Sequence, residues 1–435
     1  MASKSLQEGI FITPEKTIGN SLALVFMKLQ PHATAEGVHK FLRELWIMLK
    51  ELRSGEVREL KGSTRVHKYP DNLSVLLAFG PGIFDFISLN GNQKNKDYSR
   101  KSRPSPLSER WMFLLPSTSG GGRILKGSGL FYSQDVTINH ATNDEIIFQF
   151  ISDNQFGSHR AIVEMAKLLW QSSKSGQEIV RVNAIYSGFL RPDRRGWLGF
   201  HEGVSNLKSN ERIETVVIKE KYLENRQDYW TVGGTYMAFL RMNVDLNAWQ
   251  TVPSHQQEIL VGRDKLTGCP IIGIDRNMTP IKDSRCPEPG TLEVIDERNK
   301  YFRELPDYSS QRLPLGISDK SLQYSHIGRA RQQRNISPIL KDSLRIYRQG
   351  FEYLELLDKH PFFRTGLNFL SFQDHPSRII NLLTSPHWLG GSSFGGDPQY
   401  PIKSLRNFVT VRASGIFYVP PFSSDESFPG ESIFW

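Results

Sequence analysis

The hydrophobic pattern of the first half predicts strands that alternate with two amphipathic helices. Four apolar runs have the length of buried strands: 22–29, 73–79, 145–151 and 182–190. Residues 34–52 and 158–171 instead place apolar side chains at the i, i+3, i+4, i+7 spacing of a helix with one buried face. A polar, glycine-rich excursion over 90–128 separates the two strand–helix units.

The second half has a similar order of elements but a weaker pattern. Strands are predicted over 229–242, 345–353, 367–372 and 416–419. Helices are predicted over 246–249, over 253–260 with Pro253 at the first position, and over 376–384. A charged, proline-rich connection spans 273–320.

This order of elements predicts an α+β fold. We expect a duplicated ferredoxin-like fold, in which peripheral helices cover antiparallel sheets. The two halves are predicted at 1–195 and 196–435. No repeat is visible in the sequence itself, so the duplication rests on the order of the elements alone.

Composition and charge narrow the class of protein. The chain has 435 residues, of which 38% are hydrophobic and 23% charged, a globular composition that excludes wholesale disorder and repetitive fibres. No segment approaches the roughly 20 apolar residues of a membrane helix. The net charge of +9 permits contact with nucleic acid or an anionic membrane without indicating either. We therefore expect no nucleic-acid partner and no membrane partner, and an N-terminus without an export signal predicts a cytoplasmic location.

The commonest catalytic motifs are absent from the sequence. It contains no GxxxxGK[ST] loop, no GxGxxG after a strand, and no CxxC, HExxH or GxSxG. Two cysteines, Cys269 and Cys286, are too few for a disulfide scaffold and fit a reducing compartment, although a single bridge stays open. The common hydrolase, NTPase, dinucleotide-binding and zinc functions are thus excluded at the level of motifs.

Three segments carry residues suited to chemistry. Residues 198–206 (LGFHEGVSN) follow a strand and place Glu202 where a carboxylate can approach a flat ligand. Residues 324–330 (YSHIGRA) contain His326, and histidine is the usual ligand of haem iron in globins and peroxidases. Residues 345–353 (RIYRQGFEY) hold alternating arginines. Taken singly, these segments are more simply a turn, a structural histidine and a half-exposed strand.

Taken together, the three segments resemble motifs of the dye-decolourising peroxidases, haem enzymes of the superfamily shared with chlorite dismutases. They are similar to the family's GFxDGxxNP loop, its HIR segment and its RILRRGxxY strand. Six further segments resemble family motifs in the same order along most of the chain: 6–11 (LQEGIF, like IQGxIL), 144–150 (DEIIFQF, like DLLLQI), 233–236 (GGTY, like GGSY), 261–268 (VGRDKLTG, like IGRxKxTG), 366–373 (GLNFLSFQ, like GLLFLxFQ) and 415–421 (GIFYVPP, like GxFFVPP).

The resemblance implies a DyP-type peroxidase with one haem b per chain, bound in the C-terminal half. Such an enzyme reduces hydrogen peroxide and oxidises a small organic electron donor through a ferryl intermediate; a homo-oligomer is left open. By position, His326 matches the proximal ligand of the haem iron, and Arg348 matches the distal arginine. Glu202 stands where the family has its distal aspartate, and Leu367 and Phe369 fall in the segment that walls the distal pocket.

The glutamate at position 202 leaves the chemistry open. In the family mechanism the distal carboxylate moves a proton between the peroxide oxygens, while the arginine stabilises the developing charge. One extra methylene shifts a carboxylate by about 1 Å, and a misplacement of that size can cost roughly a hundredfold in rate. Two alternatives therefore stand beside the peroxidase: a divergent haem enzyme such as a biosynthetic oxidase, and a non-enzymatic haem-binding protein.

Other departures from the family pattern are smaller. His201, beside Glu202, is expected to point away from the site because adjacent side chains in an extended segment diverge. Gly328 and Gln349 stand where the family has arginines. We expect these two changes to alter the positive charge near the haem propionates.

Overall fold

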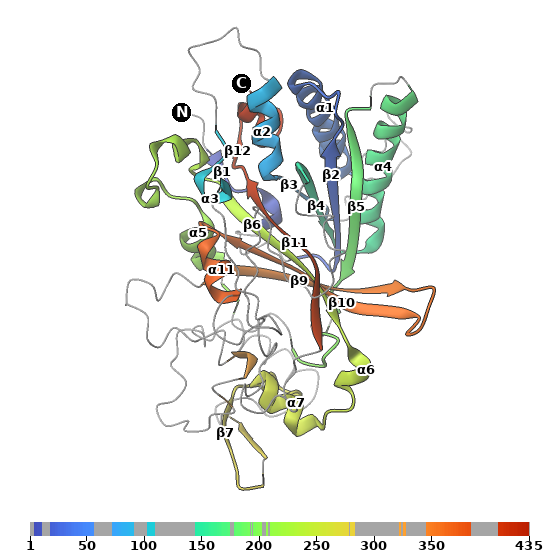
Figure 1. Cartoon of the computed structure of the whole chain (residues 1–435), viewed down its shortest axis with the longest axis vertical. Helices are drawn as coiled ribbons and strands as arrows, with labels where there is room; N and C mark the ends of the chain where they lie inside the picture. The colour runs from blue at the N-terminus through green and yellow to red at the C-terminus, as the bar shows by residue number, and fades with distance from the viewer. Residues whose placement is uncertain are drawn as a thin grey trace, which may run out of the picture.

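Eight antiparallel strands closed into a barrel form the centre of the molecule (Figure 1). The computed structural model describes residues 4–10, 18–55, 72–90, 102–108, 144–174, 178–191, 193, 195–201, 206–207, 209–277, 279–282, 322, 325–327, 345–383 and 408–434. The barrel strands are β2 (Ser21–Leu29), β3 (Ser74–Phe79), β4 (Ile146–Ser152), β5 (Val180–Phe189), β6 (Thr235–Val244), β9 (Tyr347–Leu356), β10 (Phe363–Gln373) and β11 (Val409–Val419).

The barrel consists of two four-stranded sheets that meet at two seams. The first sheet has the order β5-β2-β4-β3 and the second β11-β6-β10-β9. Among the described residues, one residue pair bridges each seam: Phe79 with Tyr418, and Phe189 with Glu352. The predicted α+β class with antiparallel sheets is confirmed. In each sheet the first strand in chain order is flanked by the fourth and the third, so the two halves have the same strand order.

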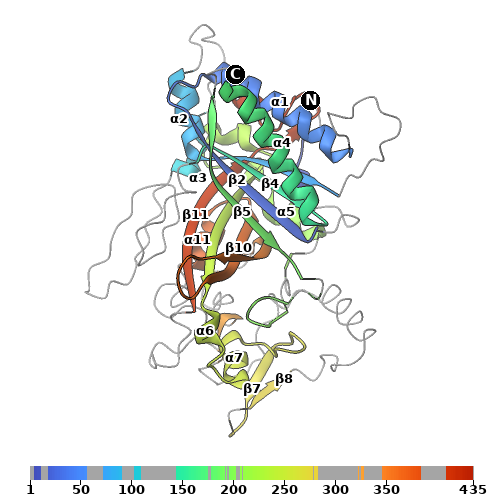
Figure 2. The ribbon, with the colours of Figure 1, turned by 90° about the vertical axis from the view of Figure 1, so that its right-hand side faces the viewer.

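Two long helices cover the outer face of the first sheet (Figure 2). They are α1 (Ala35–Arg53) and α4 (Gln155–Lys174), close to the predicted ranges. The Thr34 hydroxyl caps α1 by accepting the Gly37 N–H at 3.1 Å, and every apolar position of the predicted stripe is buried. The stripe packs on outward-facing residues of β2, so its burial holds α1 to the sheet.

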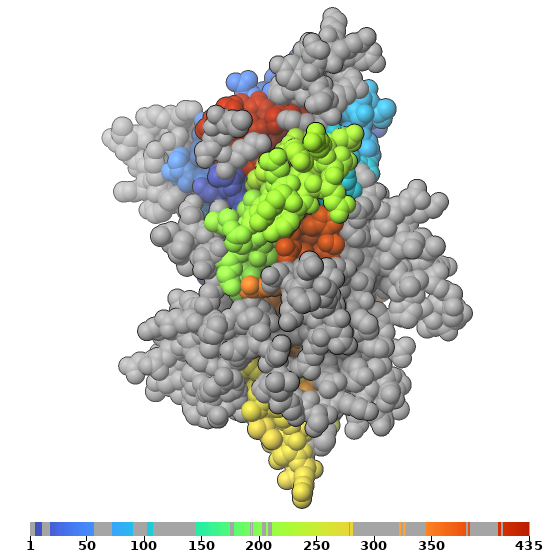
Figure 3. Space-filling view, turned by 90° about the vertical axis from the view of Figure 1, so that its left-hand side faces the viewer, coloured from blue at the N-terminus to red at the C-terminus, as the bar shows by residue number. Residues whose placement is uncertain are grey.

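The second half is covered by shorter helices. Figure 3 shows the segment from α5 (Ser209–Val216) through η3 (Glu220–Tyr222) to η4 (Arg226–Thr231), and beside it α11 (Ser377–Leu383). The predicted strand over 229–242 is wrong at its beginning, because these first residues belong to η4. Gly233, with φ of 88°, turns the chain before β6 begins at Thr235.

Helix α2 and strands β7 and β8 are among the elements that were not predicted. Helix α2 (Pro81–Asn90) begins at a proline, which a helix accepts in its first turn because the amide at that position needs no partner. Strands β7 (Ile271–Ile274) and β8 (Pro280–Lys282) form a hairpin that begins just before the expected connection. Within the described ranges, no helix has the length and apolar character needed to cross a membrane.

Two predicted helices and the hairpin lie together at the end of the molecule away from α1 and α4 (Figures 1 and 2). The helices are α6 (Leu246–Trp249), as predicted, and α7 (Ser254–Val261), where Pro253 precedes the first turn. Cys269, in the loop after α7, is fully buried and disulfide-bonded. The bridge that the sequence left open is therefore present; the other cysteine, Cys286, lies outside the described residues.

The N-terminal segment is built into the barrel through glutamine side chains. Strand β1 (Lys4–Ser5) pairs with β12 (Phe422–Ser423), and η1 (Glu8–Ile10) follows it. Gln7 donates to the Leu77 and Pro420 carbonyls at 2.9 Å and accepts the Leu77 N–H at 2.8 Å. The family-like start of the chain is therefore a structural part of the barrel. At the other terminus, η8 (Glu431–Phe434) packs on α1.

A glycine in β10 allows the centre of the second sheet to pack closely, and we predict that Gly366→Ala destabilises the fold. A Cβ at Gly366 would lie 1.9 Å from the Met242 carbonyl oxygen and 2.5 Å from the Tyr353 ring. Overpacking of this kind costs about 1–3 kcal/mol. Gly273→Ala is the control, since its nearest neighbour would be 3.5 Å away. Equal urea midpoints for the two variants would contradict the prediction.

Candidate functional site

The outer face of the second sheet carries three of the predicted site residues. Opposite residues in an antiparallel ladder share a face, and Arg348 of β9 lies opposite Ser371 of β10. Leu367 and Phe369 alternate along β10 onto the same face as Ser371. These three predicted residues, Arg348, Leu367 and Phe369, are half-buried, whereas the inward-facing Leu370 is fully buried. The face thus presents a guanidinium beside an apolar surface that the chain only partly covers.

Gln349 lies on the opposite side of the sheet, inside the barrel. Its Nε2 donates to the Gly9 carbonyl at 2.8 Å, and its Oε1 accepts from Gln149 at 3.2 Å. Because side chains alternate across a strand, Gln349 lies on the side opposite to its neighbour Arg348, and the expected change of charge near the haem stays a prediction. Gly328, the other position of that expectation, lies outside the described residues.

The loop that carries the predicted carboxylate is fixed to β9 at Arg348. We call residues 195–207 the His201 loop; its described residues are 195–201 and 206–207. The Asn206 side chain donates to the Arg348 carbonyl at 2.7 Å and accepts the Arg348 N–H at 3.0 Å. Asn206 thus pairs with β9 as a neighbouring strand would. Glu202 itself lies outside the described residues.

A second contact fixes the same loop to β9 four residues further along. The Trp197 N–H donates to Oε1 of Glu352, and the indole Nε1 donates to the Tyr353 carbonyl at 3.2 Å. The Trp197 ring also meets Phe189 of β5 edge-on at 5.8 Å. The described residues of the loop therefore meet β9 at two points, Arg348 and Glu352. His201 forms a bridge with Arg195, and its predicted orientation stays a prediction.

The end of the His201 loop is held from α5 as well. Arg212 donates through Nε to the Leu207 carbonyl at 3.0 Å and lies 4.0 Å over the Tyr347 ring. Burial lowers the pKa of the Arg212 guanidinium, and the nearby Tyr347 raises it in part. The cation therefore connects the loop, α5 and the first residue of β9.

The segment with His326 packs on a glycine at the end of α7. A Cβ on Gly262, which has φ of 85°, would lie 2.6 Å from the Ser325 hydroxyl oxygen and 3.5 Å from the Ile327 Cβ. The Ser325 hydroxyl donates to the Leu322 carbonyl at 2.7 Å. His326 itself is half-buried. Gly262 is therefore required both by its left-handed backbone and by the close approach of this segment.

Within the motif at 261–268, residues 263–268 form a turn closed by side-chain hydrogen bonds. Asp264 Oδ1 accepts the Thr267 N–H at 2.6 Å and also the Thr267 hydroxyl, while Arg263 donates to the Gly268 carbonyl at 2.8 Å. In the same turn Lys265 lies 5.7 Å from the centre of the Phe200 ring. This motif therefore contacts both the His326 segment and the His201 loop.

A small apolar cluster joins the two segments. It consists of Phe200 from the His201 loop, Trp249 at the end of α6 and Val261 at the end of α7. The Trp249 Nε1 also donates to the Leu198 carbonyl at 3.2 Å. The His201 loop and the His326 segment thus rest on the same α6–α7 support, although they are far apart in the sequence. Sequence analysis missed this support and the contacts of Trp197; only Asn206 was visible, as part of a motif.

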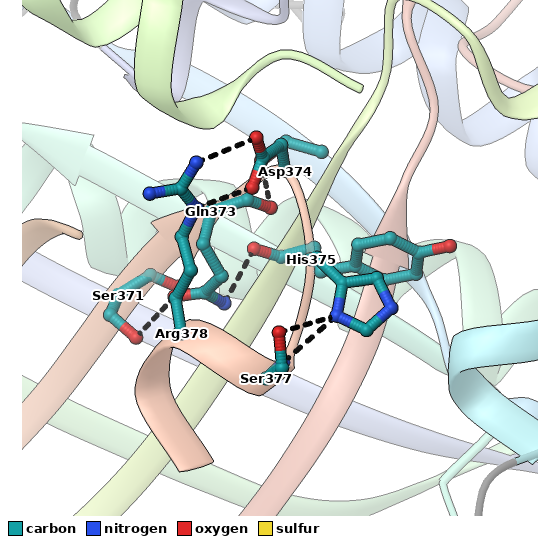
Figure 4. Close-up of polar contacts among 8 residues, drawn as sticks. Ser371, Gln373, Asp374, His375, Ser377 and Arg378 are labelled. Atoms are coloured by element: carbon teal, nitrogen blue, oxygen red, sulfur yellow. Dashed lines mark hydrogen bonds and ion pairs between the residues drawn. The ribbon is translucent and has the colours of Figure 1, made fainter. Parts of the chain in front are cut away.

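The junction between β10 and α11 is a hydrogen-bonded corner (Figure 4). Gln373 donates to the Tyr236 carbonyl at 2.9 Å and accepts from the Ser371 hydroxyl at 2.9 Å. Nδ1 of His375 accepts the Ser377 N–H at 3.1 Å and lies 2.7 Å from the Ser377 hydroxyl. His375 therefore caps α11 through an unprotonated Nδ1.

This cap predicts that stability falls in mild acid. Burial lowers the pKa of His375 below 6.5, so folding favours the neutral ring and stability is lost as pH falls below about 6.5. His375→Asn keeps a capping acceptor without titrating in this range. The melting temperature should therefore fall less between pH 8 and pH 5 in this variant than in the wild-type chain.

The comparison between variants isolates His375 from other titrating groups. Burial raises the pKa of Asp144 to about 7, but Asp144 is present in both proteins and its contribution cancels. The exposed His255→Asn is the control and should behave as wild type. Parallel pH curves for wild type and His375→Asn would show that the ring does not act as the cap.

Comparison with known proteins gives short sequence matches and longer structural ones. Deferrochelatase of Shigella flexneri is 25% identical over 208 residues, 46% of this chain and 42% of its own. Deferrochelatase of Escherichia coli K12 is 32% identical over 75 residues, 17% of this chain and 18% of its own. This chain thus spans less than half the length of the curated relatives it matches.

Two solved structures align over nearly the whole chain. Ferric DtpA from Streptomyces lividans has a TM-score of 0.62 at 19% identity, covering 97% of this chain and 95% of its own. The DyP-type peroxidase from Cellulomonas bogoriensis has a TM-score of 0.61 at 18% identity, covering 97% and 94%. These likenesses establish the fold. The family model of the C-terminal region of Dyp-type peroxidases matches residues 193–424, more than half of the sequence, and the chain therefore belongs to the Dyp-type peroxidase family.

Proposed function

We propose that this chain is a haem-dependent peroxidase that reduces hydrogen peroxide and oxidises a small organic donor. One observation carries the proposal: the His201 loop is tied by Asn206 to the residue that matches the family's distal arginine, Arg348. The tie brings together two motifs 142 residues apart, as a distal site requires. This contact supports a distal site between the two motifs.

The described residues fit a haem group. Leu367 and Phe369 offer an aliphatic and an aromatic side chain that the fold leaves half-buried, which suits contact with a flat apolar macrocycle. His326 is also half-buried, in a segment fixed by Ser325 and Gly262. An imidazole is a usual axial donor to haem iron. We therefore assign His326 as the proximal ligand, with haem b bound in the C-terminal half.

When bound, haem supplies the iron at which the oxygen–oxygen bond of peroxide is cleaved. The chain's own residues prepare that reaction. The Arg348 guanidinium stabilises the negative charge that develops on peroxide as the bond breaks. Glu202 accepts a proton from the inner peroxide oxygen and returns it to the outer one, which leaves as water. The apolar side chains of Leu367 and Phe369 limit access of bulk water to this charge.

We also propose finer features of the fold and its surroundings. The equal strand order of the two sheets supports a duplicated ferredoxin-like fold, with halves at 1–195 and 196–435. The donor is a small organic molecule, and association into a homo-oligomer stays a prediction, as does the cytoplasmic location.

An absorption spectrum before and after hydrogen peroxide separates this function from its alternatives. A Soret band that changes on addition of peroxide, and is restored by an organic donor, supports the peroxidase. A Soret band that does not respond favours a non-enzymatic haem-binding protein. Peroxide turnover far below that of Glu202→Asp favours a divergent haem enzyme. Absence of haem after reconstitution overturns all three.

His326→Ala should lose haem, because the chain then offers no imidazole at the proximal position. We expect haem content after reconstitution and size-exclusion chromatography to fall by about tenfold or more, as one strong metal–ligand bond is lost. The exposed His255→Ala is the control and should bind haem as wild type does. A normal spectrum in His326→Ala removes this residue as the ligand.

Arg348→Leu should keep haem but react slowly with peroxide. Removing one preorganised charge typically lowers the rate about 10²–10³-fold. The rate is measured by stopped-flow absorption at increasing peroxide concentration. Arg276→Leu, at an exposed position near β7, is the control. A rate within twofold of wild type would refute the assigned role of Arg348.

A further inference from the structure

Helix α4 carries an apolar stripe on the side that faces solvent. Its members Phe156, Val163 and Trp170 are 66%, 49% and 62% exposed. They are spaced by seven residues, close to two helical turns, so they lie in one line along the helix. At about 100° per residue, this line is opposite the buried Ala161 and Met165, which face the barrel. The stripe therefore does not hold α4 to its own chain.

The narrow shape of the stripe indicates what can cover it. At about 100° per residue the three side chains lie within an arc of about 40°. Arg160 and Lys167 lie at one edge of this arc, and the small Ala166 at the other. A helix that packs on a core or lies in a lipid surface needs a broader apolar face, of about 100° or more. A narrow line repeated every seven residues instead suits contact with one other helix.

The stripe is complementary to a second copy of itself. Phe156 and Trp170 stand seven residues before and seven residues after Val163. If two copies of α4 pack in opposite directions about a two-fold axis at Val163, Phe156 of each copy meets Trp170 of the other. Val163, the smallest of the three side chains, then lies where the helices are closest. A surface that matches itself in this way is what a closed two-fold dimer requires.

Charges at the two ends of α4 favour the same arrangement. Asp153 precedes the helix and Lys174 is its last residue, and both are exposed. Packing in opposite directions brings Asp153 of each copy beside Lys174 of the other, whereas packing in the same direction brings like charges together. Arg160 of one copy also approaches Lys167 of the other, but Lys167 is paired with Glu164 of its own chain at 2.8 Å. Charge complementarity therefore supports an antiparallel pair.

Further apolar side chains widen the surface on this side of the molecule. Figure 1 shows the hairpin of β9 and β10 projecting on the side where α4 and β5 lie. The exposed apolar residues are Val182 and Ile185 of β5, and Leu354, Leu356, Phe362 and Phe363 of the hairpin. With the stripe, nine such side chains at roughly 100 Å² each approach the 800 Å² or so that a stable interface takes from each partner. The area is therefore sufficient for a dimer.

We propose that the exposed side of α4 is the interface with a second copy of this chain, in which the two helices pack in opposite directions about a two-fold axis at Val163. The inference does not depend on haem or on the proposed function. None of the nine segments that resemble family motifs includes α4, so the resemblance assigns no role to this surface.

Sedimentation equilibrium of the full chain tests the interface. The wild-type protein should have twice the mass of one chain at roughly micromolar concentration. Val163→Glu places two carboxylates against each other at the axis and should raise the dissociation constant at least about a hundredfold. Ile213→Glu on α5 is the matched control, since Ile213 is 47% exposed, and should dimerise as wild type does. A monomeric wild-type chain, or an unchanged dissociation constant in Val163→Glu, overturns the inference.

Cysteine variants test the direction of packing. On oxidation, Val163→Cys should form a disulfide between two chains, because its Cβ atoms meet at the axis. Phe156→Cys alone should not cross-link, whereas a mixture of Phe156→Cys and Trp170→Cys should give the mixed dimer. Cross-linking of Phe156→Cys to itself shows packing in the same direction and contradicts the proposed axis.

Charge reversal and lipid vesicles complete the test. Asp153→Lys should raise the dissociation constant about two- to tenfold, and adding Lys174→Glu should restore it, because two exposed ion pairs are first lost and then reversed. Failure of the second change to restore the dimer refutes this pairing. A monomeric chain that co-sediments with phosphatidylserine vesicles would identify a lipid surface as the occupant of the stripe and overturn the dimer.

Discussion

The pairing of the Asn206 side chain with the Arg348 peptide is the interaction on which the candidate site depends. A side-chain amide has one donor and one acceptor side, so it can satisfy both backbone groups at the open edge of β9. Each such bond contributes only about 0.5–1.5 kcal/mol to stability. Its larger effect is geometric, because it couples the loop to the strand residue whose guanidinium faces the site.

Strand alternation explains why neighbouring residues of one motif have different roles. Arg348 faces outward toward the proposed haem site, whereas Gln349 is bonded to Gly9 inside the barrel. Gln149 and Gln373, from two other motifs, are likewise buried and bonded. Many residues in the family-like motifs therefore stabilise the barrel, and only a few of them belong to the proposed site.

The sequence predicted the elements that have strong local signals. It did not predict features that depend on contacts between segments far apart in the chain. Helix α1 has a capping threonine and a continuous apolar stripe, so its bounds were predicted closely. The start of β6 was wrong because an apolar pattern does not distinguish η4 from a strand. The contact of Trp197 with Glu352 joins residues 155 apart, and no local pattern encodes it. The site residues came from the family resemblance, and their grouping on one face came from the register.

The two attachments of the His201 loop also limit how the chain can tolerate a glutamate at position 202. Asn206 and Trp197 are bonded to backbone or buried groups of one strand, and that strand is paired along its length with β10. Sliding the loop along β9 would break both attachments, so a change of register is not available to compensate for a longer side chain between them. Within the proposed mechanism, a comparison of the native chain with Glu202→Asp therefore reports the effect of one methylene while both attachments stay in place.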